Sequence, residues 1–139
     1  MVRKCTYRKA TEADASVMFM KLRESDKQEL IAMHGINVDY LSVLQNAVKV
    51  SAESYVAESD GEVILMFGVS TFDAKRNLGC PWLLGSDKST KLAKELIMDG
   101  RIYVRSWASK FNGLINFIDE RNTVSKRWLK RIGFTLHNP

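Results

Sequence analysis

The sequence predicts one α/β domain, in which helices flank a mixed β-sheet. Its 139 residues are enough for one sizeable core, and 45% hydrophobic with 27% charged residues are ordinary for a globular protein. Strand-like segments alternate with segments of helical spacing along the chain. Residues 63–72 are apolar almost throughout, which predicts a central strand that is covered on both faces.

The first third is predicted to form a strand and then helices. Residues 5–10 are short and partly alternating, as expected of a strand. Thr11 offers a capping hydroxyl ahead of acidic residues, so helical structure is expected from there to about Met33, with His34-Gly35 as its stop. A second helix is expected over residues 39–48, because its apolar side chains fall on one side.

A β-hairpin is predicted next, followed by a further strand and a long helix. Asp60-Gly61 is a strong two-residue turn between strands 54–58 and 63–72. After a polar loop, residues 80–84 are expected to form another strand. Apolar side chains then keep helical spacing from Leu92 to about Lys110, and Gly100 is the weak point of that helix.

The last quarter is the most informative stretch. Residues 114–118 are expected to form a buried strand, and a polar turn then carries Asn122. A helix is predicted from Thr123 to about Arg131, ending at Gly133, and a short final strand should follow Phe134. The predicted order of elements is therefore β-α-α-β-β-β-α-β-α-β.

This order resembles that of the GNAT-superfamily N-acyltransferases, in which an Asn opens the last helix and a Gly-Phe pair ends it. Within that superfamily the chain looks most like the small acetyltransferase-like proteins of tailed phages, the family that contains the podovirus internal virion protein A. The resemblance covers nearly the whole chain and is most specific from Trp82 to Phe134. It implies a single GNAT-like domain over residues 1–139, acetyl-CoA as the cofactor, other virion proteins as partners, and the host cytoplasm or the virion as location.

The resemblance also implies where a cofactor would lie. In GNAT enzymes the pantetheine of acyl-CoA fills a gap between the fourth and fifth strands. Backbone N–H groups of the loop before the next helix hold the pyrophosphate, because a helix N-terminus offers unpaired donors and partial positive charge. The residues at these positions of the present sequence are Leu84, Gly85, Ser86, Lys88, Ser89, Thr90 and Asn122.

This loop departs from the pattern of active members, which usually carry Gln/Arg-x-x-Gly-x-Gly/Ala. The chain has one glycine there, and Asp87 adds negative charge beside the expected phosphates. The sequence therefore predicts weak or no binding of acetyl-CoA. An ordinary helix start, capped by Ser89 and favoured by Asp87, is the structural alternative.

The catalytic residues are also atypical. Many GNAT enzymes protonate the thiolate leaving group with a tyrosine whose position corresponds to Leu129, and leucine has no proton to donate. Glu29, Glu58, Asp119 and Glu120 are candidate bases by residue type, and Glu29 and Asn122 are the two catalytic candidates retained. Asn122 has a simpler role open to it, as the N-cap of the last helix.

A charge cluster occupies residues 23–29. Arg23, Asp26 and Glu29 resemble a pattern in the phage family, and in GNAT folds this region walls the acceptor side. The alternative is a set of ion pairs at i, i+3 on a helix surface, each of which contributes only tenths of a kcal/mol, about 0.2–0.5.

The charge of the chain is unevenly divided. Residues 1–74 hold 8 basic and 11 acidic residues, a net of −3, whereas residues 75–139 hold 13 and 5, a net of +8. Lys126, Arg127, Lys130 and Arg131 form a basic stripe on the last helix. A polyanion, such as the phosphates of coenzyme A or a nucleic acid, would suit this half, and a solvated basic surface is the alternative. Trp82, Trp107, Trp128 and Phe134 are predicted to face the core.

Several function classes find no support in the sequence. No apolar stretch approaches the ~20 residues of a membrane span, and the N-terminus lacks a secretory signal. Cys5 and Cys80 are expected as reduced thiols, and His34 and His137 lack neighbours at metal-ligand spacing. Three classes stay open: a catalytically degenerate GNAT-fold protein of virion assembly, an acetyl-CoA-dependent N-acetyltransferase, and a nucleic-acid-binding module.

Overall fold

The computed structural model describes residues 2–118, 122–135 and 137 of the chain. One sheet has the strand order β1-β2-β3-β4-β5. The strands are β1 (Thr6–Lys9), β2 (Glu53–Ser59), β3 (Glu62–Asp73), β4 (Leu78–Gly85) and β5 (Gly113–Leu114). The helices are α1 (Glu12–Met18), the 3-10 turn η1 (Phe19–Lys21), α2 (Glu24–His34), α3 (Tyr40–Val50), α4 (Asp87–Lys91), α5 (Ala93–Lys110) and α6 (Thr123–Ile132).

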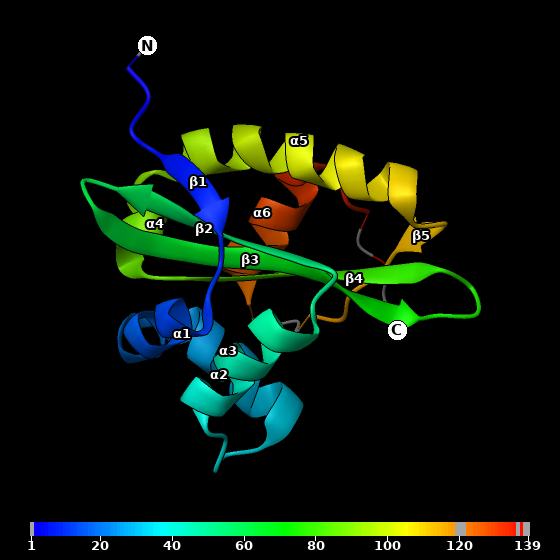
Figure 1. Ribbon diagram of the computed structural model, residues 1–139, viewed down its shortest axis with the longest axis horizontal. Coiled ribbons are helices and arrows are strands. Elements are labelled where there is room, and N and C mark those ends of the chain that lie inside the picture. Colours follow the sequence, from blue (N-terminus) through cyan, green and yellow to red (C-terminus); the bar gives the residue numbers. More distant parts are fainter. Residues whose placement is uncertain (1, 119–121, 136, 138–139) are drawn as a thin grey trace.

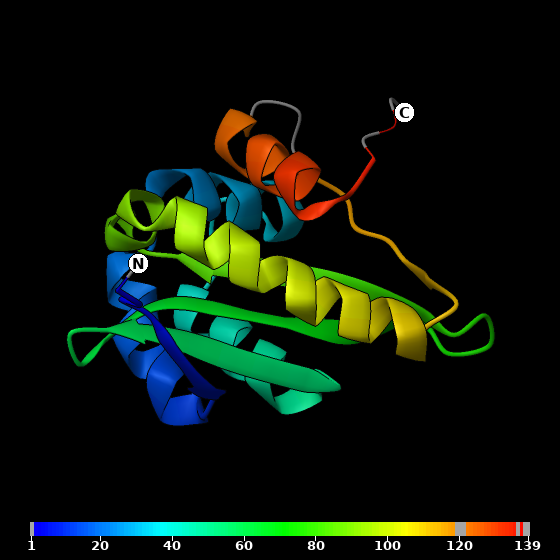
Figure 2. The same ribbon diagram turned by 90° about the horizontal axis from the view of Figure 1, so that it is seen from above.

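The predicted fold class is confirmed. Strands β1 to β4 pair antiparallel, and β4 pairs parallel with β5, so the sheet is mixed. Helices α1, α2 and α3 lie on one side of the sheet and α5 lies on the other (Figure 1). Figure 2 shows α6 beside α5, on the side away from β1. Each face has its own apolar core, one with Met18, Leu44 and Met66 and one with Phe67 and Trp107.

The central strand and the hairpin follow the sequence closely. Residues 63–69 of β3 are all buried, as expected of a strand covered on both faces. Asp60 and Gly61 both have positive φ angles, of 52° and 74°, which the two-residue turn requires. The hairpin prediction is therefore confirmed in position and in turn residues.

The first helical region is broken where one helix was expected. Helix α1 starts with a capping box between Thr11 and Asp14, but the chain becomes extended at Leu22 and Arg23 before α2 begins. This break lets the Arg23 N–H donate to the Gly85 carbonyl oxygen, 2.8 Å away. A contact with β4, 62 positions along the chain, thus replaces a helical hydrogen bond. The stop at Gly35 is confirmed by its φ of 95°.

The long helix was correctly predicted, and Gly100 does not interrupt it. Helix α5 runs unbroken through Gly100, and the short helix α4 precedes it with a break at Leu92. A Cβ atom built on Gly100 would lie 3.4 Å from Cδ1 of Ile132, a residue of α6. The glycine therefore lies where α6 packs against α5.

The buried strand expected over residues 114–118 is mostly absent, which corrects the prediction. Strand β5 ends at Leu114, and Ile115, Asn116 and Phe117 are exposed. Pro81 of β4 has no N–H to offer a neighbouring strand, and its carbonyl oxygen instead accepts from the Asn116 side-chain amide at 2.6 Å. Backbone pairing therefore stops after two residue pairs.

The C-terminal helix agrees with the sequence. Asn122 caps α6, since its Oδ1 accepts from the Ser125 N–H at 3.1 Å, and the helix ends at Gly133 with a φ of 127°. Phe134 and Thr135 are irregular, and most of the expected final strand falls outside the described residues. No helix among the described residues has the length and apolar character that crossing a bilayer requires.

Candidate functional site

The gap beside β4 is the candidate site. Its strand pairs are Leu78 with Gly113 and Gly79 with Leu114, after which β4 and the chain beyond β5 diverge. The Pro81 carbonyl and the Gly85 N–H both bond on the side away from β3. Because these directions alternate along an antiparallel strand, the backbone polar groups of Leu83 face the same side. Among the described residues, no backbone partner pairs with this edge of β4 between Gly79 and Gly85, so the edge is of the kind that could bind an extended group.

A cavity of about 120 Å³ lies in this gap. Its walls come from β3, β4, α2, α5, α6 and the segment 116–118, and they are mostly apolar. Seven aromatic side chains line it: Phe67, Trp82, Tyr103, Trp107, Phe117, Trp128 and Phe134. Of the residues that the structure describes, Asp26, Glu29, Asn116 and Ser125 supply its polar lining.

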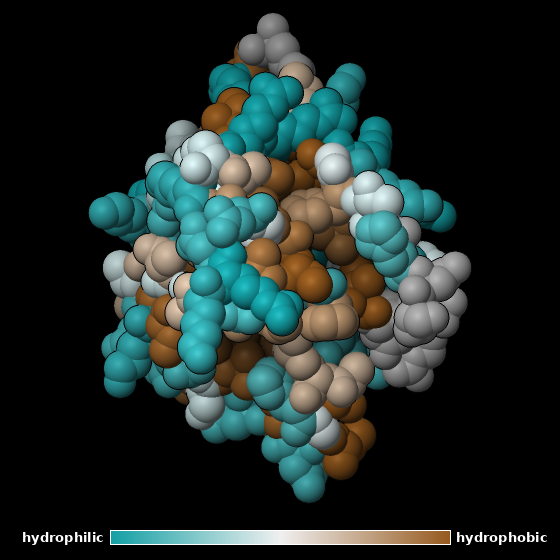
Figure 3. Space-filling view, turned by 90° about the vertical axis from the view of Figure 1, so that its right-hand side faces the viewer, coloured by the Kyte–Doolittle hydropathy of each residue, from teal (hydrophilic) through white to brown (hydrophobic). Residues whose placement is uncertain are grey.

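The end of the molecule where β5 lies is also apolar in part. Phe72 and Phe117 are 49% and 67% exposed, and their ring centroids are 6.1 Å apart. Figure 3, which views the molecule from that end, shows apolar side chains gathered around a hollow with polar side chains at its margins.

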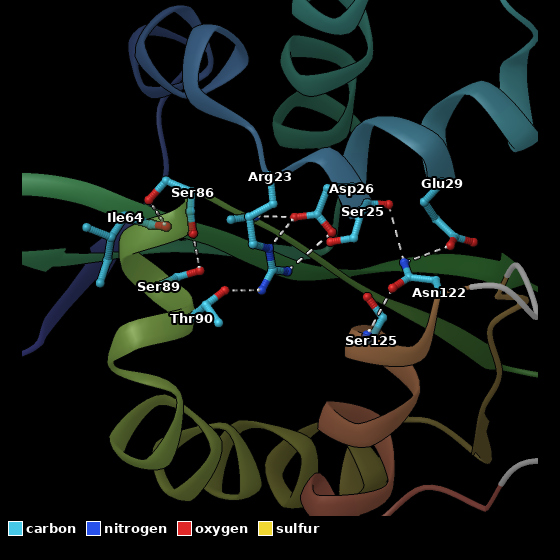
Figure 4. Close-up of polar contacts among 11 residues, drawn as sticks. Arg23, Ser25, Asp26, Glu29, Ile64, Ser86, Ser89, Thr90, Asn122 and Ser125 are labelled. Carbon is cyan, nitrogen blue, oxygen red and sulfur yellow. Dashed lines mark hydrogen bonds and ion pairs between the residues drawn. The ribbon is translucent and has the colours of Figure 1, made fainter.

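The two catalytic candidates lie together at one wall of the cavity. The Asn122 side-chain amide donates to the Glu29 carboxylate at 3.0 Å and to the Ser25 carbonyl oxygen at 3.4 Å (Figure 4). Asn122 is 8% exposed, and its side-chain oxygen Oδ1 caps α6. The hydrogen bond between Asn122 and Glu29 therefore joins the start of α6 to α2, although the two residues are 93 positions apart in the sequence.

The remaining candidate bases do not join them. Glu58 lies on β2 and forms an ion pair with Arg8 at 2.7 Å. Asp119 and Glu120 lie outside the described residues. Glu29 is thus the one candidate base, among those that the structure describes, that lines the cavity.

The loop expected to hold a pyrophosphate is short, and its two serines donate hydrogen bonds to carbonyl oxygens of β3 and of the loop itself. Helix α4 begins at Asp87 with Ser86 at the N-cap position, so the expectation that Ser89 caps the helix is wrong. The Ser86 N–H and hydroxyl both donate to the Ile64 carbonyl oxygen, at 3.0 and 3.2 Å. The Ser89 N–H and hydroxyl both donate to the Ser86 carbonyl oxygen, at 3.0 and 2.7 Å. These serine donors are therefore used inside the protein.

A third N–H group of the loop, that of Gly85, donates to Asp26. Its carboxylate accepts from the Gly85 N–H at 2.8 Å and from Nε and Nη2 of Arg23 at 2.9 and 3.2 Å. Nη1 of Arg23 lies 3.4 Å from the Thr90 hydroxyl, and its guanidinium carbon lies 5.3 Å from the ring centroid of Trp128. Figure 4 shows the Arg23 side chain, from the residue that precedes α2, between Asp26 and Thr90.

The Arg23–Asp26 ion pair is buried, so the alternative of an ion pair on a helix surface is wrong for these two residues. The side chains of Arg23 and Asp26 are only 4% and 2% exposed. Burial raises the pKa of Asp26 above its ordinary value, and the Arg23 guanidinium and the Gly85 N–H oppose that rise. The pair connects α2, the loop and α6, so it belongs to the framework of the site.

The predicted cofactor-binding residues fall into two groups. Leu84, Gly85, Ser86 and Ser89 are buried in the loop region, Thr90 is exposed, and Lys88 forms an ion pair with Glu62 at 3.1 Å. Asn122 lies apart from them, beside Glu29. A Cβ atom on Gly85 would lie 2.4 Å from the Ser89 hydroxyl oxygen, so packing inside the loop already accounts for this glycine.

Leu129, at the position of the expected acid, lines the cavity. Tyr103 also lines it, and burial is the main cause that raises the pKa of its phenol, followed by the carboxylates of Asp99 and Glu53. The sequence did not place Tyr103 at the site. Its position one turn before Trp107, on the apolar face of α5, was the signal that could have done so.

Of the four aromatic residues that were predicted to face the core, two are buried and two are half-buried. Trp107 and Trp128 are buried, as predicted, whereas Trp82 and Phe134 are half-buried. All four line the cavity. In the basic stripe, Arg127, Lys130 and Arg131 are exposed, and Lys126 is half-buried.

Comparison with known proteins identifies structures of similar fold, but no sequence match. No family model and no curated protein matches the sequence. Among solved structures, Ard1 from Thermoplasma volcanium matches with a TM-score of 0.66 at 13% identity, covering 98% of this chain and 86% of that one. An acetyltransferase of the GNAT family from Streptococcus pneumoniae matches with a TM-score of 0.65 at 15% identity, covering 97% and 87%.

A third similar structure contains a cofactor. It is a predicted acetyltransferase from Clostridium acetobutylicum, with acetyl-CoA, at a TM-score of 0.61 and 15% identity over 96% of this chain and 92% of that one. The three structures agree with the mixed sheet and its flanking helices. The chain therefore has a GNAT-like acetyltransferase fold over nearly its whole length.

Proposed function

We propose that this chain is a GNAT-fold protein that does not transfer acyl groups and that acts as an interaction or internal virion protein of a phage. The observation that supports the loss of activity is that three N–H groups of the loop, those of Gly85, Ser86 and Ser89, are bonded within the protein. Asp26, Ile64 and Ser86 accept the N–H groups of Gly85, Ser86 and Ser89, respectively. A pyrophosphate would have to compete with these partners for donors.

The charge near the loop supports the same proposal. The buried carboxylate of Asp26 and the exposed carboxylate of Asp87 both lie where a diphosphate would need positive charge. Arg23 is paired with Asp26, and Lys88 with Glu62. Leu129 brings no proton donor to the cavity.

Isothermal titration calorimetry with acetyl-CoA tests this proposal. We expect no dissociation constant tighter than about 10 μM, which corresponds to roughly −7 kcal/mol. Tighter binding would contradict it and favour an enzyme. For the virion role, quantitative mass spectrometry of purified phage particles should find the chain at a fixed copy number. Its absence from the particles would remove that part of the proposal.

An acetyl-CoA-dependent N-acetyltransferase is the second candidate. The open edge of β4 and the Glu29–Asn122 pair beside the cavity favour it, as does the similarity to a structure solved with acetyl-CoA. On this reading Glu29 would accept a proton from an amine in the cleft. Release of free thiol from acetyl-CoA, in the presence of a panel of amines, tests it. Turnover that Glu29→Gln abolishes would establish this candidate in place of the first.

A further inference from the structure

The edge of β4 that faces away from β3 is satisfied at both ends. At one end the Gly79 carbonyl oxygen accepts from the Ile115 N–H at 2.8 Å. The next outward carbonyl oxygen, that of Pro81, accepts from the Asn116 side-chain amide at 2.6 Å. At the other end the N–H and the carbonyl oxygen of Gly85 both have partners, each 2.8 Å away. Groups of the protein therefore take the place of a neighbouring strand on either side of the middle.

Leu83 is the exception in the middle of this edge. Outward groups alternate along a strand that pairs antiparallel, so those of Leu83 point the same way as those of Pro81 and Gly85. Among the residues that the structure describes, neither the N–H nor the carbonyl oxygen of Leu83 has a partner on that side. Leu83 thus presents one donor and one acceptor, which one extended strand satisfies together.

The aromatic cavity lies on one face of this open position. The Leu83 side chain packs against the apolar cluster that contains Phe67, Trp107 and Trp128, and the same three rings line the cavity. Side chains alternate between the two faces of a sheet, so a strand residue paired with Leu83 would turn its side chain to the same face. That side chain would enter the cavity.

The size of the cavity suits one apolar side chain. The cavity measures about 120 Å³, and an apolar cavity of ~150 Å³ is known to hold benzene. A leucine or methionine side chain is smaller than benzene in heavy atoms and therefore fits. Figure 3 shows apolar side chains gathered around the hollow at this end of the molecule.

The helix that forms one wall of the gap is basic. Its side chains form no ion pair with any residue that the structure describes, and they are Lys126, Arg127, Lys130 and Arg131. Arg101 of α5 adds a further cation beside α6, because its Nε donates to the Arg131 carbonyl oxygen at 2.8 Å. Charge complementarity therefore favours an acidic partner over a neutral or basic one.

We propose that the gap beside β4 binds an extended acidic peptide segment of a partner protein, which pairs with Leu83 and inserts one leucine or methionine side chain into the cavity. The segment runs parallel to β4, as β5 already does. In strand addition the backbone hydrogen bonds supply affinity, and pockets for alternate side chains supply specificity. Acidic residues on either side of the anchoring side chain complement α6.

A single-stranded nucleic acid would satisfy the charge of α6 as well. Its sugar–phosphate backbone has no N–H group to donate to the Leu83 carbonyl oxygen, whereas a peptide has one at each residue other than proline. The backbone hydrogen bonds at Leu83 therefore distinguish the two classes of partner, and they are the interactions to test.

The inference deepens the proposed function, because it rests on the chain being an interaction protein whose gap is not filled by acyl-CoA. The two can fail separately. Tight binding of acetyl-CoA contradicts the proposed loss of activity, whatever the peptide does. Failure to bind the peptide overturns the peptide site and leaves the acetyl-CoA result unchanged.

The probe is a fluorophore-labelled peptide, Asp-Glu-Thr-Leu-Thr-Glu-Asp, acetylated and amidated at its ends. It is titrated with the full chain in the absence of acetyl-CoA, and fluorescence anisotropy reports binding. We expect a dissociation constant of about 100 μM or tighter. No binding up to about 1 mM would overturn the proposal.

Methylation of single backbone nitrogens tests the strand pairing on the unaltered protein. In a parallel pair, the N–H that donates to the Leu83 carbonyl oxygen belongs to the threonine after the anchoring leucine. Methylating this nitrogen should weaken binding about tenfold, because it removes one hydrogen bond and leaves an acceptor unpaired. Methylating the leucine nitrogen, which points away from β4, is the control and should change affinity little. Equal effects of the two methyl groups would contradict strand pairing, and displacement of both methylated peptides by a thymidine oligonucleotide would favour a nucleic acid instead.

A cavity-filling variant tests the anchoring side chain. Leu129 is half-buried and lines the cavity, so Leu129→Phe should weaken peptide binding about tenfold by occupying the space of the anchor. Leu41→Phe, at a half-buried leucine outside the cavity, is the matched control and should not change it. If Leu129→Phe does not fold, a peptide with serine in place of the leucine makes the same test on the unaltered protein. Undiminished binding of the serine peptide would contradict the anchor.

Discussion

The two ends of the gap beside β4 differ in how their polar groups are satisfied. At the loop end, the N–H groups of Gly85, Ser86 and Ser89 have partners inside the protein. Past Pro81, the strand edge at Leu83 faces a cavity lined by aromatic rings. The gap is thus open along the edge of β4, whereas the N–H groups at its loop end are bonded to acceptors of the protein.

This difference shows that separate residues determine the open gap beside β4 and the bonded loop that follows β4. The gap opens because Pro81 ends the pairing with β5 and the Asn116 side chain takes its carbonyl oxygen. The loop closes because the chain leaves its helix at Arg23, which brings Arg23 and Asp26 beneath β4. The gap and the loop can therefore be altered independently by substitution.

The largest effect is expected at the closed end. Asp26→Ala removes one partner of a buried ion pair and leaves the Arg23 charge and the Gly85 N–H without an acceptor. We expect a loss of about 3–5 kcal/mol in the free energy of unfolding, measured in urea. The matched double variant Arg23→Met/Asp26→Leu should recover part of this loss, because it removes both charges at similar volume but still leaves the Gly85 N–H without the Asp26 acceptor. A cost below about 1 kcal/mol for Asp26→Ala would show that the pair does not hold the loop.

A second effect tests the packing of the loop itself. In Gly85→Ala the new Cβ would lie 2.4 Å from the Ser89 hydroxyl oxygen and 3.0 Å from Cδ1 of Leu65. Overpacking of this kind costs about 1–3 kcal/mol. Removing the hydroxyl in Gly85→Ala/Ser89→Ala should recover part of the loss, so the two changes should be non-additive by about 0.5 kcal/mol or more. Strict additivity would mean that the loop relaxes freely.

At the open end, the same kind of truncation should cost less. Leu129 is half-buried and faces the cavity, so Leu129→Ala should destabilise by about 1–2 kcal/mol, below the ~2–5 typical of a fully buried leucine. Leu96→Ala, at a residue only 3% exposed, is the comparison and should fall in the higher range. An unchanged melting temperature together with lost acetyl transfer would instead make Leu129 part of a working active site.

The pH dependence of stability offers a smaller test of the closed end. The pKa of Asp26 is raised in the folded protein, chiefly by burial, so the folded state binds its proton more tightly than the unfolded state does. The stability from Asp26 is therefore fully present below its unfolded pKa and is lost as pH rises through the folded pKa. Relative to Asp26→Asn, the wild type should lose unfolding free energy as the pH rises above about 4, the ordinary pKa of an aspartate. A difference that grows with pH would mean that Arg23 outweighs burial.

What the sequence predicts well is local. Asp60-Gly61 specifies its turn, Asn122 and Gly133 mark both ends of α6, and the apolar run of β3 identifies the central strand. Each signal lies within a few residues of the structure it determines. The GNAT-like order of elements follows from these local signals and from the resemblance of the last quarter.

What the sequence could not predict depends on contacts between distant segments. The charged run at residues 23–29 has the composition of a helix surface, yet Arg23 and Asp26 are buried because β4 and α6 cover them. Residues 114–118 have the composition of a buried strand, yet Pro81 prevents its pairing. The cavity combines side chains from segments that are far apart in the sequence, and the spacing of residues along one helix or strand cannot predict that they meet.

The last prediction concerns the outer surface, where the smallest change in stability is expected. Reversing both charges in Lys126→Glu/Lys130→Glu should alter the free energy of unfolding by less than about 1 kcal/mol, because Lys130 is exposed, Lys126 is only half-buried, and charges in contact with solvent contribute little. Retention on heparin should nevertheless be lost if the stripe on α6 binds polyanions, and in the wild type it should fall steeply with salt as counterions are released. The double variant Lys9→Glu/Lys49→Glu, at exposed lysines of the acidic half, makes the same change in net charge. Equal losses from both variants would mean that retention follows net charge alone. A loss confined to the α6 variant would locate a polyanion site on α6, and it would make this surface the most direct route to a partner.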